Sequence, residues 1–465
     1  MSIREQLDPF MKPRSVALLG VSRRTGEEAF NILENMLNTG YRGKLYPVNP
    51  NVTELLGLHA FPTVKAIADP VDLAVVTTPR DLALPMIREC LDKGIRAITV
   101  VAQGFADTGE QGRAQQREMT RVARSGGARV IGPNTFGTAN AFANFNTAFV
   151  PARMLPIPIG LICQTGVFFV GFPGLVLLGK GFDLGNACDV DHAEALEYFE
   201  DDPEVRLVVL HIEGLSRGER LLEVARHTTK KKPVLVWKTG ATEQAARMAQ
   251  SHTGSLAGKD AVWDAALRRS GVLRVRELDE LRDLVKGFTC LPPLRGRNIG
   301  VVTFTGGYAI MALDACAHSN IGMPPLGTGA RAIIAGMSPP WLHVGNPVDI
   351  WPAMSSRRDF SGMADALVTA FRAVLSEPQV HALLFIGGAF ASRWTRNVCQ
   401  LLIDIAAQFP SKPVTAYFYG QYATEADEVA SASGRVAVFP SVERAVHTLS
   451  RLAEYQSQAT EPVQA

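Results

Sequence analysis

Short apolar runs alternate with amphipathic segments along almost the whole chain. The runs are rich in Val, Ile and Leu, and the segments between them carry polar residues at helical spacing. Wholly apolar strands separated by helices are typical of parallel sheets that are covered by helices on both faces. The pattern therefore predicts an α/β protein built from repeated strand–helix units.

The predicted strands fall into three groups, which we interpret as three domains: 1–150, 151–292 and 293–465. The strands expected in the first domain are 15–20, 44–48, 73–78, 97–102 and 128–132. Those expected in the second domain are 159–164, 206–212, 233–238 and 271–275. Those expected in the third domain are 299–304, 381–387, 413–418 and 436–439. A proline-containing stretch, CLPPLRGRN at 290–298, predicts the linker between the last two domains, and the polar end of the chain predicts a frayed tail.

The second and third domains open in the same way. IGLICQTGVF begins at residue 159, and IGVVTFTGGYA begins at residue 299. In both stretches a strand leads through a turn of small residues into a helix. We expect both to be flavodoxin-like parallel-sheet modules, whereas the first domain predicts a Rossmann-like unit with a helix over 27–40 that ends at Gly40.

Composition and charge exclude several classes of protein. Hydrophobic residues make up 47% of the 465 residues, charged residues make up 20%, and the net charge is +2. A nearly neutral chain has no field that would draw it to nucleic acid or to an acidic membrane surface. The six cysteines form no C-x-x-C pair, which favours a reduced cytoplasmic protein, and the histidine spacing indicates no metal site.

One uncharged segment has the length of a membrane span. Residues Met154–Gly179 carry no charge, but they include Pro156, Pro158 and Pro173, several glycines and a central Gln-Thr pair. Proline and glycine at such a density favour a strand, a tight turn and a buried helix over a membrane-spanning helix. We therefore expect no membrane segment.

The first strand leads into a candidate phosphate site, GVSRRTGEEAF, at residues 20–30. A dinucleotide fingerprint needs glycine where Ser22 and Thr25 stand, and the second strand ends in PVNP without an acidic residue. Bound nicotinamide cofactor is therefore not expected. The hydroxyl of Ser22 and the guanidinium of Arg23 suit an exposed phosphate, although a turn that binds nothing would give the same pattern.

Three more loops follow predicted parallel strands. They are TTP at 77–79, AQGF at 102–105 and GPNTFG at 132–137. Open α/β sheets bind ligands at the carboxyl edge of their strands, so all three should lie on the edge that Gly20 also occupies.

His252 lies in the stretch MAQSHTGSLAGKD and is the strongest candidate for chemistry in the second domain. A metal ligand is not expected, because no second histidine or cysteine lies nearby in the sequence, so the residues themselves leave open a structural histidine and a phosphoryl carrier. A phosphohistidine needs amide donors and small neighbours, which TGSLAG and Thr165-Gly166 could supply. A carboxylate at Glu213, after the strand 206–212, could orient the imidazole.

These motifs resemble those of the NDP-forming acyl-CoA synthetases, the superfamily that includes succinyl-CoA synthetase. PRSVALLGVSRRTGEEAF is similar to the CoA-binding opening of that family, GPNTFG to its GPN loop, HIEGL to its glutamate strand and SHTGSLAG to its phosphohistidine motif. TFTGG and GNPVD at 345–349 resemble markers of its third domain. The resemblance covers nearly the whole chain.

The resemblance implies a ligase that interconverts a carboxylate, CoA and ATP with acyl-CoA, ADP and phosphate. It implies that His252 carries the phosphoryl group and that Glu213 holds its ring. The residues implied for phosphate binding are Gln164, Thr165, Gly166, Thr253 and Gly254. The residues implied for CoA binding are Gly20, Ser22, Arg23, Pro47, Asn49, Thr78, Pro79, Gln103, Gly104 and Asn134. It further implies that ATP or ADP and Mg²⁺ bind a separate ATP-grasp β subunit, within an α2β2-type hetero-oligomer.

The chain departs from the family pattern at CQTG (163–166), where the family usually has S-Q-S-G. The segment after it, VFFVGFPGLVLL, is bulkier than expected and indicates an acyl group larger than acetyl. Two other functions therefore stay open: a CoA-binding regulatory or scaffold protein of the same fold that has lost turnover, and, less favoured, a nicotinamide-dependent oxidoreductase.

Overall fold

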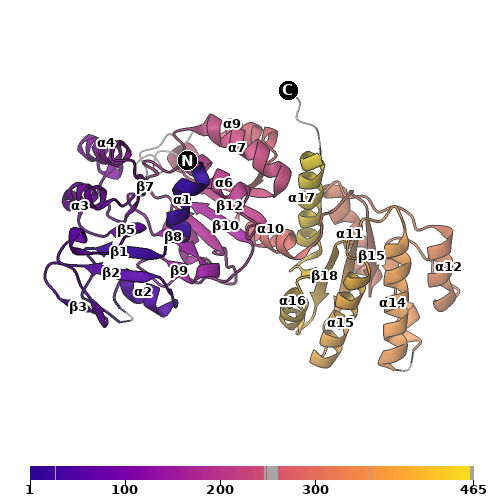
Figure 1. Ribbon diagram of the computed structural model, residues 1–465. Helices are drawn as coiled ribbons and strands as arrows, with labels where there is room; N and C mark the ends of the chain where they lie inside the picture. The colour runs from indigo at the N-terminus through magenta and orange to yellow at the C-terminus, as the bar shows by residue number, and fades with distance from the viewer. Residues whose placement is uncertain (27, 246–247, 249–259, 358, 461–465) are drawn as a thin grey trace. The chain divides into compact units, whose positions relative to one another are not determined.

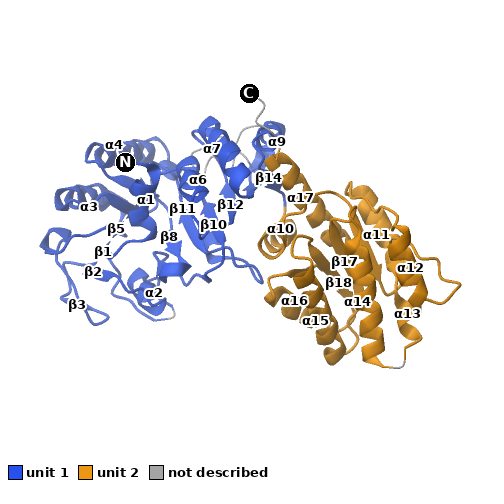
Figure 2. Cartoon of the chain, turned by 45° about the vertical axis from the view of Figure 1, so that its right-hand side comes forward, with its two compact units in different colours: residues 1–276 blue, residues 277–465 orange. Residues whose placement is uncertain are grey.

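The computed structural model describes residues 1–26, 28–245, 248, 260–357 and 359–460 (Figure 1). The chain divides into two compact units, Met1–Arg276 and Glu277–Ala465 (Figure 2). The first unit holds two large sheets and the second unit holds one.

The first sheet has five parallel strands in the order β2-β1-β5-β6-β7. Its strands are β1 (Ser15–Leu19), β2 (Lys44–Val48), β5 (Leu73–Val76), β6 (Ala97–Val100) and β7 (Arg129–Ile131). Its helices are α1 (Ile3–Met11), α2 (Ile32–Asn38), α3 (Arg80–Lys93) and α4 (Glu110–Ser125). Val16 and Leu18 of β1 share a core with α1 and α2, whereas Ala17 and Leu19 share the opposite core with α3 and α4. Helices therefore cover both faces, as the apolar strands predicted.

The second sheet has seven strands in the order β14-β13-β12-β10-β11-β8-β9. They are β8 (Gly137–Asn140), β9 (Phe145–Asn146), β10 (Ile159–Cys163), β11 (Lys180–Asp183), β12 (Leu207–Ile212), β13 (Val234–Lys238) and β14 (Leu273–Val275). Strands β10 to β14 are parallel, but β8 is antiparallel to β11 and β9 is antiparallel to β8. The expectation of an all-parallel sheet was therefore wrong at this edge.

The third sheet is parallel and has the order β16-β15-β17-β18-β19. Its strands are β15 (Ile299–Thr303), β16 (Val348–Asp349), β17 (Ala382–Gly388), β18 (Val414–Tyr419) and β19 (Val436–Val438). When the parallel strands of each sheet are numbered along the chain, all three sheets have the order 2-1-3-4-5. That order is the flavodoxin-like one, and its switch point lies between the first and third strands. The predicted repeat between the second and third sheets is confirmed.

The division between the two units lies earlier than the predicted boundary at 292. Helix α10 (Leu278–Cys290) packs within the second unit, where Lys286 pairs with Asp427 (2.7 Å) and Arg444 pairs with Asp283 (2.6 Å). The predicted linker CLPPLRGRN follows α10 inside this unit, and its Leu294 is buried. Prolines in that stretch therefore mark a packed turn and not a hinge.

Two predicted helices are shorter than expected. The helix predicted over 27–40 begins at Ile32, because Asn31 caps it by accepting a hydrogen bond from the N–H of Glu34 (3.2 Å). The helix predicted after CQTG is only α5 (Gly166–Val170) and ends at Gly171, whose φ is +94°. Among the described residues, no helix is long and apolar enough to cross a membrane.

Candidate active site at the switch point of the second sheet

The carboxyl ends of β10 and β12 lie side by side at the switch point of the second sheet. Gln164 follows β10 and Glu213 follows β12, and both side chains are buried. The Oε1 atom of Gln164 accepts hydrogen bonds from the N–H of Glu213 (2.7 Å) and of Gly214 (3.2 Å). The structure therefore brings the predicted phosphate-binding glutamine and the predicted carboxylate together.

Gly166 is fixed by its close approach to an aromatic ring. A side-chain carbon at position 166 would lie 2.6 Å from Cζ of Phe136, so a larger residue would displace that ring. Thr165 stands at the N-cap of α5 without using its hydroxyl for a cap hydrogen bond. Because α5 has five residues, its dipole is small, and an anion here would depend on individual N–H and O–H donors.

A cavity of about 420 Å³ opens at this point. It brings together five of the predicted site residues from the first and second sheets: Gln103, Asn134, Gln164, Thr165 and Gly166. Its remaining lining is mostly apolar and consists of Val101, Thr135, Phe136, Phe149, Val167, Val170, Gly171 and Asp183. The side chains of Val167 and Val170 were expected inside a buried helix, but they are exposed.

Asp183 is a lining residue that the sequence did not single out. It ends β11, and its Oδ2 accepts a hydrogen bond from the N–H of Phe136 (2.7 Å). Burial raises the pKa of Asp183 to about 6, and the N–H groups of Phe136 and Gly185 partly oppose this increase. KGFD lacks the apolar pattern of a strand because it contains a buried lysine, Lys180, which pairs with Asp202 (2.5 Å).

The predicted CoA loops meet at the switch point of the first sheet, between β1 and β5. Gly20 has a φ of +81°, and a side-chain carbon there would lie 2.6 Å from Cγ2 of Thr78. Asn49 donates from Nδ2 to the carbonyl of Val21 (3.1 Å), which ties the end of β2 to the same turn. Only a glycine at position 20 lets these loops come so close together.

The other predicted CoA residues have different surroundings. Ser22 accepts a hydrogen bond on Oγ from the N–H of Arg24 (3.1 Å), and Arg23 is exposed beside it. Pro79 precedes α3, and Arg80 donates from Nη1 to the carbonyl of Gly104 (2.8 Å). Pro47 lies inside β2, where it pairs in register with Leu18 and is buried. Pro47 therefore supports the sheet, and direct contact of its side chain with a ligand is not expected.

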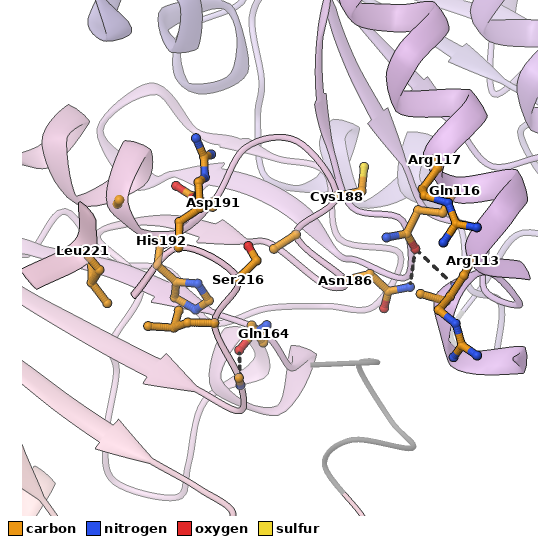
Figure 3. A pocket seen from close by; sticks show the side chains of 16 residues that line it. Arg113, Gln116, Arg117, Gln164, Asn186, Cys188, Asp191, His192, Ser216 and Leu221 are labelled. Carbon is orange, nitrogen blue, oxygen red and sulfur yellow. Dashed lines mark hydrogen bonds and ion pairs between the residues drawn. The ribbon is translucent and has the colours of Figure 1, made fainter. Parts of the chain in front are cut away.

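A second, smaller cavity of about 270 Å³ lies beyond Gln164, which lines both cavities. Figure 3 shows Arg113, Gln116 and Arg117 of α4 on one side and Asp191 and His192 on the other. Its cations are already paired, because Arg113 and Arg117 contact Glu110 (3.0 and 2.7 Å) and Arg217 contacts Asp191 (2.7 Å). Because Arg113 and Arg117 share the single carboxylate of Glu110, pairing reduces the positive charge on this side of the cavity but does not remove it.

His252, Thr253 and Gly254 lie outside the described residues. The segment that contains them begins after β13 and ends at α9 (Asp260–Arg269). Since β13 is parallel to β12 and pairs Lys238 with Ile212, the segment leaves the sheet at the edge where Glu213 stands. The described residues 239–245 therefore start at the edge where Glu213 stands, and the predicted contact between His252 and Glu213 stays a prediction.

Lys238, at the end of β13, is the other residue that sequence reasoning missed. It is buried, and it donates from Nζ to the carbonyls of Glu213 (2.9 Å) and of Thr239. Burial, together with the nearby charge of Arg274, lowers the pKa of Lys238 to about 8, although the charges of Asp260 and Glu213 oppose this decrease. A lysine at the end of an apolar strand looks like a solvated strand end, so the sequence held no signal for this contact.

Two family descriptions match most of the first unit. Residues 14–141 match the family described as CoA binding domain, and residues 157–288 match the succinyl-CoA ligase like flavodoxin domain. These regions contain the predicted CoA loops and the switch point with Gln164 and Glu213.

Individual relatives extend the match to the whole chain. The chain is 33% identical over 457 residues to the α subunit of acetate–CoA ligase [ADP-forming] I of Pyrococcus furiosus, covering 96% of this chain and 97% of that one. It is also 33% identical to acetate–CoA ligase [ADP-forming] II of Archaeoglobus fulgidus, covering 80% of this chain but only 56% of that protein. Among solved structures, a dinucleotide-forming acetyl-coenzyme A synthetase of Candidatus Korarchaeum cryptofilum, determined with phosphate and ADP, matches with a TM-score of 0.87 and 30% identity, over 98% of this chain and 97% of that one.

Proposed function

This chain belongs to the NDP-forming acyl-CoA synthetase superfamily, and we propose that it is the subunit on which the phosphoryl group is carried between acyl phosphate and ADP. Its activity is that of an ADP-forming acid–thiol ligase, and it uses CoA. The same relatives disfavour the two other functions considered, the non-catalytic scaffold and the oxidoreductase.

The reaction has three steps, and each step transfers one group. Inorganic phosphate attacks the thioester carbonyl of acyl-CoA, which gives acyl phosphate and releases the CoA thiol. His252 then attacks the phosphorus of acyl phosphate, so that the P–O bond breaks and the free carboxylate leaves. Finally ADP takes the phosphoryl group from His252 and becomes ATP. In the opposite direction, ATP drives thioester formation.

The single observation that supports this proposal best is the hydrogen-bonded pair at the switch point. Gln164 holds the N–H of Glu213, and Thr165 and Gly166 stand next to it in a cavity that Asn134 also lines. A carboxylate at this place can hold one ring nitrogen of an imidazole and leave the other free to attack phosphorus. The donors around Thr165 can bind the phosphate while it is transferred.

The CoA site extends from the turn at Gly20 to the cavity. The pyrophosphate would contact Ser22 and Arg23 at the switch point of the first sheet, and the thiol end would reach Gln103 and Asn134. If so, Ser22→Asp weakens CoA binding about tenfold, because the new carboxylate repels phosphate. Isothermal titration of CoA into the variant measures this effect. Unchanged affinity would remove Ser22 from the site.

Nucleotide binding belongs to a partner in this proposal. The relative from Pyrococcus furiosus is named as an α subunit, and the relative from Archaeoglobus fulgidus is matched over only 56% of its length, so that relative has room for further domains. We propose an ATP-grasp β subunit that binds ATP or ADP with Mg²⁺, in an α2β2-type assembly. None of the six cysteines, all of which lie in the described part of the chain, forms a disulfide, which fits a reducing cytoplasm.

The acid in this proposal is an apolar monocarboxylic acid that is larger than acetate. The outer wall of the cavity carries Phe136, Phe149, Val167 and Val170. Among the described residues that line it, none is a lysine, arginine or histidine that could pair with a second carboxylate. A hydrophobic wall of this kind favours a larger apolar group by about 0.8 kcal/mol per buried methylene. A series of straight-chain and aromatic acids, compared by kcat/KM with acetate and succinate, tests this.

Labelled ATP tests the phosphoryl carrier. The chain is mixed with an ATP-grasp partner subunit and γ-labelled ATP, and the protein is then treated with acid or base. Label on the chain that survives base, is lost in acid and is missing from His252→Ala supports the proposal. Equal labelling of His252→Ala would overturn it.

A further inference from the structure

The backbone of Glu213 is held from both sides by side chains of the neighbouring strands. Gln164, after β10, accepts a hydrogen bond from the Glu213 N–H (2.7 Å), and Lys238, at the end of β13, donates one to the Glu213 carbonyl (2.9 Å). The peptide groups before and after the Glu213 Cα are therefore both fixed. This restricts the directions in which the carboxylate can point.

Burying Lys238 at this position costs free energy, because its ammonium group loses contact with water. Only 4% of its surface is exposed, and its ammonium lies 5.4 Å from the ring centroid of Trp263. The charged groups around it are Glu213, Asp260 and Arg274. A buried ammonium is tolerated when carbonyl oxygens and an aromatic face replace its water. The lysine uses these groups, and one of its two carbonyl partners belongs to the residue that the reaction needs.

Lys232 gives a built-in comparison, because it stands at the other end of β13. It is also buried, and it donates from Nζ to the carbonyls of Phe199 (2.7 Å), Asp202 (3.0 Å) and Val205 (2.8 Å). Those carbonyls lie at the opposite edge of the sheet, one in the last turn of α6 (His192–Glu200) and two between α6 and β12. Lys232 therefore has a structural role of the same chemical kind, away from the active site.

We propose that Lys238 is a positioning residue that orients Glu213, and through it the histidine ring, for phosphoryl transfer. The inference rests on the function proposed above, and it assigns to Lys238 no contact with substrate. Loss of Lys238 removes this donor from the Glu213 carbonyl, so the peptide is held less firmly and the direction of the carboxylate is less restricted. Misplacement of an orienting group by about 1 Å costs up to a hundredfold in rate.

The test is a double-mutant cycle that combines Lys238→Met with Glu213→Gln. The rate of acid-labile labelling from γ-labelled ATP, with the ATP-grasp partner present, is measured in a single turnover. We expect Lys238→Met to lower this rate by ten- to a hundredfold without changing the affinity for CoA. Lys232→Met, which removes the lysine donor from three carbonyls, should lower thermal stability at least as much and leave the rate within twofold.

If Lys238 acts through Glu213, the double variant is no slower than Glu213→Gln alone. Multiplied losses, or equal rates for Lys238→Met and Lys232→Met, would overturn the proposal while the wild-type label still supported the proposed function. Absence of label on the wild-type chain would instead contradict the proposed function itself. Lys238→Arg keeps a cation beside Trp263 but moves the donor, and it serves in the same cycle if Lys238→Met does not fold.

Discussion

The second and third sheets are two copies of one module, and they differ at three corresponding positions at the strand ends. When IGLICQTG is placed on IGVVTFTG, Gln164 corresponds to Phe304. By the strand registers, Glu213 of the second sheet then corresponds to Gly388 of the third sheet, and Lys238 corresponds to Phe418. The same backbone therefore carries a glutamine, a carboxylate and a lysine at one switch point, and two phenyl rings and a glycine at the other.

The two modules share one fold but differ in the side chains at these positions. In the third sheet, Phe304 packs against Phe385 with ring centroids 5.2 Å apart, so the switch point is closed by apolar contact. In the second sheet, Gln164 at the same place turns toward the backbone of Glu213. The parallel sheet brings strand ends together in both modules, but chemistry arises only where those ends are polar.

The largest effect should come from the carboxylate that the third sheet lacks. Glu213→Gln keeps the size and the backbone contacts but removes the charge that holds the imidazole. We expect the rate of His252 phosphorylation to fall about a thousandfold, as for other carboxylates that orient a catalytic histidine. Rapid-quench labelling measures the rate. A loss of less than threefold would mean that the Glu213 carboxylate takes no part in the reaction.

The next effect is the pH dependence of the free energy of unfolding. Lys238 buries a charged group, whereas Phe418 at the corresponding position carries no charge. The pKa of Lys238 is about 8 in the folded protein, below the value of about 10.4 for an unfolded lysine. Between these values the unfolded state binds more protons, so raising the pH stabilises the native state. Relative to Lys238→Met, wild type should gain on the order of 2–3 kcal/mol between pH 8 and pH 10.5.

Urea unfolding at several pH values measures this gain. Lys231→Met serves as the matched control, because Asp201 and Glu200 raise the pKa of Lys231 to about 12, so Lys231 keeps its charge in the native state throughout this range. A wild-type curve parallel to that of Lys238→Met would show that Lys238 titrates normally.

The smallest effects should separate the two threonines that begin the helices after the first strand of each module. Thr305 caps α11 (Gly306–His318) by accepting a hydrogen bond from the N–H of Gly307 (3.2 Å), whereas Thr165 makes no such cap. Thr305→Ala should therefore cost about 1 kcal/mol of stability and leave phosphorylation unchanged. Thr165→Ala should leave stability unchanged and slow phosphorylation about tenfold.

Thermal melts and labelling rates of both variants decide this prediction. If Thr305→Ala slowed labelling as much as Thr165→Ala, the two modules would share the reaction, and the contrast between them would be lost.

The sequence predicted the central strands well, because each is a mainly apolar run between amphipathic segments. It missed β8, β9, β11 and β16, which are short or contain polar residues that pairing and burial hide, such as Lys180 with Asp202. It placed Glu213 and Thr165 at the correct edge, because parallel strands align their carboxyl ends. It could not find the contact between Lys238 and the Glu213 carbonyl, since that contact depends on tertiary packing. The division at 276–277 was missed because the apolar residues of α10 give no sign of which unit they join.

The position of the phosphoryl group tests most directly whether His252 is the phosphoryl carrier. The chain, its ATP-grasp partner and ATP are allowed to react without ADP, and the chain is digested under basic conditions that preserve phosphohistidine. Mass spectrometry by electron-transfer fragmentation then locates the added phosphoryl group. We predict that the added phosphoryl group is on His252, in the peptide that contains SHTGSLAG. A phosphoryl group on another residue, or a fully active ligase whose His252 is never modified, would contradict it.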